Sequence, residues 1–230
     1  MPDTYQVNDP KRRNAAVAPS RTAAGLPETG FVFASFNNSH KYTPMMFDIW
    51  MRLLRQVEGS VLWLFENNTL MAHNLRREAE ARGIPPARLV FAPFAELADH
   101  LARLRLADLY LDVLPYNAHT GASDALWAGL PIVTCTGTSF AGRVATSLLQ
   151  AMDVPELITR DLGEYEARAL TLARNPFILT DVKVKLMKNR LGTKLFDFSR
   201  YRRHLEEAYI HMWQRQDRGE APQGFAVPPL

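Results

Sequence analysis

The sequence predicts an α/β fold with a doubly wound, Rossmann-like parallel sheet. Six short apolar runs recur along the chain, and a helical pattern follows each of them. The runs are GFVFASF (30–36), SVLWLF (60–65), RLVFAPF (88–94), DLYLDV (108–113), PIVTC (131–135) and the shorter ELIT (156–159). Strands that alternate with helices in this way form a mostly parallel sheet that is covered on both faces, with right-handed crossovers.

The first strand is followed by the polar loop FNNSHKYTP, which contains Asn38 and Lys41. Thr43 and Pro44 then start a helix, because threonine caps helix N-termini and proline suits the first helical position. Lys41 is placed for a diphosphate, since a lysine at the end of a strand neutralises phosphate oxygens as a mobile point charge. An ordinary polar loop is the alternative. The chain has no GxGxxG motif here, which argues against a dinucleotide dehydrogenase.

The helix after the third strand carries His100 and Arg103. Its sequence ELADHLARLRLAD predicts an apolar stripe of Leu97, Leu101 and Leu104, with the two polar side chains three residues apart at the edge. An imidazole can stack on a nucleobase, and a guanidinium can bond its edge. Solvated side chains on a helix rim are the alternative.

The stretch HTGASDALWAGL (119–130) predicts a helix between the fourth and fifth strands. Such a helix starts at the carboxyl end of the preceding strand, with free N–H groups and the positive end of its dipole exposed. Thr120 and Gly121 would present those groups to a phosphate, and His119 stands beside them. Asp124, one turn further on, could accept hydrogen bonds from ribose hydroxyls. Simple helix capping is the alternative.

Two loops therefore matter most for binding. In the common strand order of such folds, the topological switch point lies between the first and fourth strands. Ligands bind there, at the carboxyl ends of the strands. Asn37–Thr43 and Pro115–Asp124 are the loops that follow these two strands. Together they predict a nucleotide site.

Composition narrows the class of protein. The 230 residues are 47% hydrophobic and 22% charged, which excludes disorder of the whole chain. The net charge of +3 is spread over many segments and does not indicate a nucleic-acid partner. The basic run KVKLMKNR (183–190) is predicted to be the solvated face of a helix rather than a nucleic-acid patch.

The chain carries no signal for a membrane or for export. No apolar run approaches the roughly 20 residues that span a bilayer, and the first thirty residues lack the apolar core of a signal peptide. The single cysteine, Cys135, lies in an apolar strand and is predicted to be buried. A cytoplasmic protein is expected.

The two ends differ from the middle. Residues 1–27 and the ending QGFAVPPL are irregular and rich in proline. Before that ending, a helix is predicted with an apolar side, which we expect to pack on its own domain rather than on a missing lobe or a second copy. That side consists of Tyr201, Leu205, Tyr209, Met212 and Trp213.

Several long motifs, in order, resemble one family. They are PDTYQVNDPKRR, FNNSHKYTP, SVLWLF, FAPFAELADHLARLRLADLYLDVLPYNAHTGASDALWAGLPIVT and LFDFSRYRRHLEEAYIHMW. Together they cover nearly the whole chain, and they are similar to the carboxyl-terminal catalytic lobe of protein O-GlcNAc transferase and its bacterial and SPINDLY-type relatives. The resemblance implies an inter-lobe connector (1–27), a nucleotide-sugar-binding lobe (28–216) and an irregular tail (217–230).

The family resemblance implies a GT-B glycosyltransferase, in which two Rossmann-like lobes clamp a nucleotide sugar. The reaction would be inverting, metal-independent transfer from a UDP-GlcNAc-type donor to Ser or Thr of proteins, with no cofactor. By motif position, Asn38 and Lys41 would contact the diphosphate, and the Ala95 backbone, His100 and Arg103 would hold the base. The donor sugar and diphosphate would meet His119, Thr120 and Gly121, and the ribose would meet Asp124.

Three positions depart from the family pattern. Leu97 replaces a lysine near the ribose, Asn38 replaces a glutamine, and Gly121 replaces the second threonine of HTTG, so donor affinity or choice is expected to differ. SPINDLY-type relatives use GDP-fucose, which leaves the base open between uracil and guanine.

The amino-terminal lobe, which carries the family's proposed catalytic histidines, and the tetratricopeptide repeats are not recognisable here. No catalytic residue is therefore assigned. The chain is expected to bind nucleotide but to turn over poorly alone. A stand-alone nucleotide-sugar-binding module is the alternative.

Overall fold

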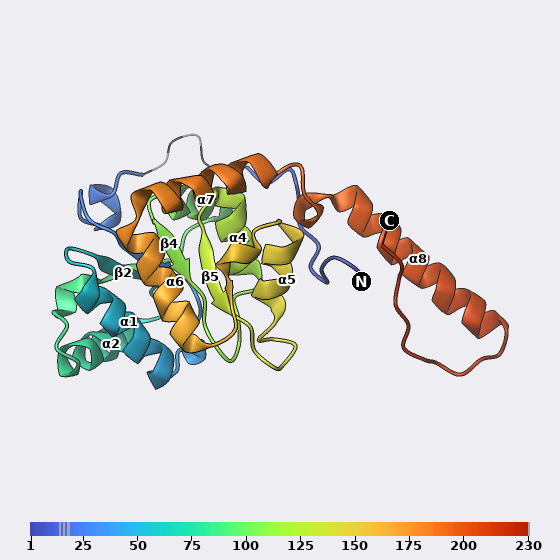
Figure 1. Ribbon diagram of the computed structural model, residues 1–230, viewed down its shortest axis with the longest axis horizontal. Coiled ribbons are helices and arrows are strands. Elements are labelled where there is room, and N and C mark those ends of the chain that lie inside the picture. Colours follow the sequence, from blue (N-terminus) through green and yellow to red (C-terminus); the bar gives the residue numbers. More distant parts are fainter. Residues whose placement is uncertain (14, 16, 18, 230) are drawn as a thin grey trace.

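The protein contains one six-stranded, all-parallel sheet (Figure 1). The computed structural model describes residues 1–13, 15, 17 and 19–229. The strand order is β3-β2-β1-β4-β5-β6. The strands are β1 (Val32–Ser35), β2 (Val61–Phe65), β3 (Leu89–Ala92), β4 (Leu109–Leu111), β5 (Ile132–Cys135) and β6 (Ile158–Thr159). Each lies within a predicted apolar run, so the predicted α/β fold is confirmed.

The order in which the strands are added reverses between β1 and β4, as predicted: β2 and β3 lie on one side of β1, and β4, β5 and β6 lie on the other. Phe33 pairs with Leu109, and Ala34 with Tyr110, while the other edge of β1 pairs with β2. The loops after β1 and β4 therefore leave the sheet side by side at its carboxyl edge. A crevice at this point is where open parallel sheets bind ligands.

Eight α-helices lie among the described residues. They are α1 (Pro44–Gln56), α2 (Thr69–Ala81), α3 (Leu97–Leu104), α4 (Thr120–Ala128), α5 (Val144–Ala151), α6 (Leu162–Arg174), α7 (Pro176–Asn189) and α8 (Phe198–Asp217). Right-handed crossovers that run in opposite directions from the switch point place α1 and α4 on opposite faces of the sheet. The helix α6 returns to pack beside α1, and α4 packs between α3 and α5.

Short 3₁₀ turns connect several elements. They are η1 (Thr22–Ala24), η2 (Ser39–Lys41), η3 (Pro86–Arg88), η4 (Pro155–Leu157) and η5 (Lys194–Phe196). The predicted start of α1 is confirmed, because Thr43 accepts a hydrogen bond from the backbone N–H of Met46 at 3.3 Å and Pro44 is the first helical residue.

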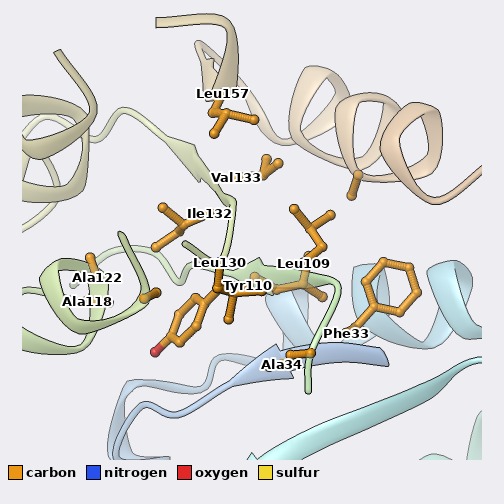
Figure 2. Close-up of a cluster of buried hydrophobic side chains, with 14 of the residues drawn as sticks. Phe33, Ala34, Leu109, Tyr110, Ala118, Ala122, Leu130, Ile132, Val133 and Leu157 are labelled. Atoms are coloured by element: carbon orange, nitrogen blue, oxygen red, sulfur yellow. The ribbon is translucent and has the colours of Figure 1, made fainter. Parts of the chain in front are cut away.

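The core lies between the central strands and the helices on both faces. Figure 2 shows side chains of β1, β4 and β5 meeting in one cluster, with Ala122 of α4 and Leu157 beside them. Tyr110 is fully buried among these apolar groups. Cys135 is buried in β5, as predicted. Burial on both faces explains why the strands are almost wholly apolar.

Two expectations about helix faces are wrong. Leu97 is 53% exposed, because it is the first residue of α3 and extends beyond the stripe of Leu101 and Leu104. The helix α8 extends away from the α/β body (Figure 1), so its far half does not pack on its own domain. Tyr209 and Trp213 in that half are exposed. No helix within the described ranges combines the length and hydropathy required to cross a membrane.

Candidate functional site

The two predicted loops meet at the carboxyl edge of β1 and β4. Lys41, in the loop after β1, donates a hydrogen bond from Nζ to the carbonyl oxygen of Asn117 in the loop after β4, at 3.0 Å. Its ammonium also lies 3.9 Å from the ring centre of Tyr116. Burial lowers the pKa of Lys41, while the nearby Asp112 carboxylate raises it. These contacts hold the Lys41 side chain at the crevice.

The amino terminus of α4 faces the same crevice. Its N-cap is His119, whose side chain makes no capping bond, and the first intrahelical bond runs from the N–H of Ser123 to the His119 carbonyl. Among the described residues no acceptor takes the N–H groups of Thr120, Gly121 or Ala122. No side chain therefore caps this helix among the described residues, and three backbone N–H groups lie without an acceptor at the positive end of its dipole.

A buried carboxylate holds the loop that leads into α4. Asp112 accepts hydrogen bonds from the N–H of Ala118 and from the hydroxyl of Thr134, both at 2.6 Å. It is 1% exposed. Burial raises its pKa from 3.8 to about 6, against the opposing effect of these hydrogen bonds. Asp112 thereby fixes the loop in which Asn117 and His119 lie.

His119 is arranged as a neutral imidazole. Its Nε2 lies 3.3 Å from the carbonyl oxygen of Ala141, and its Nδ1 lies 2.9 Å from the hydroxyl of Tyr5. A carbonyl only accepts, so Nε2 carries the proton and Nδ1 accepts from Tyr5. Burial lowers the pKa of His119, which agrees with the neutral form. Tyr116 packs on the same ring at a centroid distance of 5.0 Å.

The predicted base-binding residues line a pocket beside the crevice. The pocket has a volume of about 420 Å³ and is walled by Phe36, Phe65, Phe94, Ala95, Glu96, Leu97, His100 and Arg103. Arg103 donates to the Pro93 carbonyl at 2.6 Å and to His100 Nδ1 at 3.1 Å. Burial, and then the Arg103 charge, lower the pKa of His100 to about 4. Arg103 is buried and His100 is partly buried, so neither is a freely solvated side chain on the rim of α3.

Gly121 lies against the buried hydroxyl of Tyr110. A Cβ at this glycine would approach that oxygen to 3.3 Å. The same hydroxyl accepts hydrogen bonds from the N–H of Phe36 at 3.1 Å and from the side-chain amide of Asn37 at 3.3 Å. The tyrosine on β4 thus fills space that a larger side chain at position 121 would enter.

The remaining predicted residues are placed less decisively. Asn38 is exposed and caps η2, accepting from the N–H of His40 at 3.5 Å. Asp124 is buried in α4, where Arg12 donates to its Oδ1 at 2.6 Å. Sequence reasoning assigned no role to Tyr5, Arg12 or Asp112, although all three lie in the quoted motifs, because their contacts form only in the folded chain. In the described part of the chain, no group of three His, Cys, Asp or Glu side chains could hold a metal ion.

The fold and the comparisons with solved structures define the class of protein. A mutant O-GlcNAc transferase from Thermobaculum terrenum superposes with a TM-score of 0.75 at 29% identity, covering 93% of this chain and 39% of that one. Sucrose-phosphate synthase from Thermosynechococcus elongatus, 14% identical with a TM-score of 0.60, shares the fold alone. The chain is one Rossmann-like lobe of the GT-B glycosyltransferase type.

The sequence comparisons identify the family. The sequence model of glycosyl transferase family 41 matches residues 6–205, and the chain belongs to that family. A probable UDP-N-acetylglucosamine–peptide N-acetylglucosaminyltransferase, SEC, from Arabidopsis thaliana is 37% identical over 99% of this chain and 24% of its own length. The corresponding Caenorhabditis elegans protein is 35% identical over 90% of this chain and 18% of its own length. The predicted family resemblance is confirmed, and the chain spans about a quarter or less of these curated relatives.

Proposed function

We propose that the chain is the nucleotide-sugar-binding lobe of an inverting, metal-independent protein O-glycosyltransferase. The observation that carries the proposal is the free amino terminus of α4, which shares its crevice with the Lys41 ammonium. Three N–H donors, a dipole end and a cation together suit a diphosphate. The names of the Arabidopsis and C. elegans relatives support UDP-GlcNAc as donor and a peptide as acceptor.

We assign each part of the donor to one part of the site. The base would enter the pocket beside His100 and Arg103, next to the Ala95 backbone. The ribose would lie near Asp124 and the diphosphate between Lys41 and the start of α4, with Asn38 at the rim. The neutral His119 would contact the donor sugar.

The chemistry proposed for this lobe is stabilisation of a leaving group. In an inverting transfer the acceptor hydroxyl attacks the anomeric carbon from the face opposite the diphosphate, and negative charge grows on the diphosphate as the glycosidic bond breaks. Lys41 and the N–H groups of Thr120 and Gly121 would stabilise that charge without a metal ion. The groups that bind and deprotonate the acceptor would belong to the other lobe, so we expect this lobe alone to bind nucleotide with little or no turnover.

Thermal unfolding with millimolar UDP, GDP or ADP in EDTA tests the proposal. A ligand at about 100 times its Kd stabilises the fold by roughly 2.7 kcal/mol, a shift in Tm of several degrees for a domain of this size. UDP or GDP should give a selective, metal-free shift, and the better of the two identifies the base. No shift with any nucleotide would refute the proposal.

The variant Lys41→Met links the binding to the assigned site. It should reduce the UDP-induced shift, because it removes the cation at the diphosphate position. Lys188→Met is the matched control, since Lys188 is exposed on α7, away from the crevice. Equal UDP affinity for both variants and the wild type would place the nucleotide elsewhere.

A further inference from the structure

The first thirteen residues connect α8 to the candidate site. Asp3 forms ion pairs with Arg200 of α8 at 2.6 Å and with Lys194 at 3.5 Å. The hydroxyl of Tyr201 donates to the carbonyl oxygen of Tyr5 at 3.0 Å. These contacts fix the path of this end of the segment, although no strand and no α-helix forms there. The segment then passes over α4.

Arg12 links the segment to α4 with two hydrogen bonds and makes a third within the segment itself. It donates from Nη1 to Asp124 Oδ1 at 2.6 Å, and from Nη2 to Asn8 Oδ1 at 2.7 Å and Ser123 Oγ at 3.2 Å. The side chains of Arg12 and Asp124 are each 9% exposed. A buried guanidinium bound in this way is fixed in position, as is the carboxylate that it contacts.

The second oxygen of Asp124 is left available. Oδ2 accepts no hydrogen bond from any residue that the structure describes, whereas Oδ1 is held by Arg12. Burial raises the pKa of Asp124, and the Arg12 charge lowers it. Without Arg12 the carboxyl group would therefore be easier to protonate and free to rotate, and each change would weaken it as an acceptor.

We propose that Arg12 is a positioning residue for the nucleotide: it fixes Asp124 so that the free Oδ2 accepts hydrogen bonds from the ribose hydroxyls of a bound nucleoside diphosphate. The inference rests on the proposed function and adds a residue of the amino-terminal segment to it. Arg12 does not touch the ligand. Its effect passes through Asp124 and therefore requires the ribose hydroxyls.

Calorimetric titration with UDP and with 2′,3′-dideoxy-UDP tests this dependence. Arg12→Met should weaken UDP binding roughly tenfold to a hundredfold, the range expected when a charge-assisted hydrogen bond is lost. Binding of the dideoxy compound should change little, since it has no hydroxyl for Asp124. Arg12→Lys should recover part of the UDP affinity, because it keeps the charge without the fork of donors.

Two further variants control for the loss of an ion pair elsewhere and for misfolding of Arg12→Met. Arg21→Met is the matched control, because Arg21 pairs with Asp108 at 2.9 Å at the opposite edge of the sheet. It should leave the affinity for both nucleotides unchanged. The double variant Arg12→Met with Asp124→Asn leaves no unpaired buried charge if Arg12→Met alone does not fold. Its UDP affinity should equal that of Asp124→Asn.

The outcomes separate the two proposals. If the wild type binds UDP but Arg12→Met weakens both ligands equally, or neither, Arg12 is only structural and the inference is wrong. Tighter UDP binding by Arg12→Met would also overturn it, since the contact would then block the site. A wild type that binds no nucleotide would refute the proposed function, and the inference with it.

Discussion

The buried carboxylate of Asp112 should make the stability of the fold fall as the pH rises. Its pKa in the folded chain is raised from 3.8 to about 6, because burial disfavours the charged form. Between these two values the folded state binds more protons than the unfolded state. Stability is therefore greatest below pH 3.8 for this group and is lost as the pH rises through 6.

The size of the effect follows from the shift. A difference of about two pKa units corresponds to about 3 kcal/mol. Asp112→Asn removes the titrating group, and the amide oxygen can still accept from the N–H of Ala118, which Asp112 bonds at 2.6 Å. The wild type should therefore lose about 2.4 kcal/mol relative to this variant between pH 4 and pH 7, because a small part of the total is already lost at pH 4.

Urea unfolding of both proteins at several pH values between 4 and 8 measures this difference directly. Every other titrating group is common to the two chains, so subtraction removes its contribution. A free-energy difference that stays constant across this range would refute the reasoning, because it would mean that Asp112 is already ionised at no cost in the fold.

Two further predictions concern His100 and the cap of α2. The imidazole of His100 should titrate near pH 4 in an NMR titration, since burial and the Arg103 charge lower its pKa to about 4; a midpoint above 6 would show that the base pocket is open to water. Asn68→Ala should lower the free energy of unfolding by about 1 kcal/mol, because Asn68 Oδ1 accepts from the N–H of Met71 at 2.8 Å. The same variant should leave UDP affinity unchanged, and a change in affinity would contradict the assignment of the site to the α4 edge.

The fold was predictable because its signals are local. Apolar runs mark the strands, and Thr43 with Pro44 marks the start of α1. The switch point followed from the chain order of the strands, since the loops after β1 and β4 meet there. His119 and Lys41 came together for the same reason.

The missed residues depend on tertiary contacts instead. Arg12 lies in an irregular segment, and its partner Asp124 is 112 residues away in the sequence. Its hydrogen bonds are visible only once the fold places that segment over α4. Asp112 was included in an apolar strand run, although it follows the last residue of β4 and turns inward to the loop. The prediction for the far half of α8 was wrong because an apolar stripe indicates that a helix face can pack against another surface. The stripe does not identify that surface as the helix's own domain.

The polar groups beneath the crevice lower the stability of the fold, but they hold the side chains of the crevice in place. Burial raises the pKa of Asp112, so its ionised form at pH 7 lowers the stability of the fold relative to a neutral group at the same position. It is nevertheless bound to the loop that carries Asn117, and the Asn117 carbonyl in turn holds Lys41. Buried polar networks of this kind reduce stability but fix side chains in one arrangement. Fixed donors should strengthen the binding of a flexible diphosphate, because the conformational entropy of these side chains is then lost on folding rather than on binding.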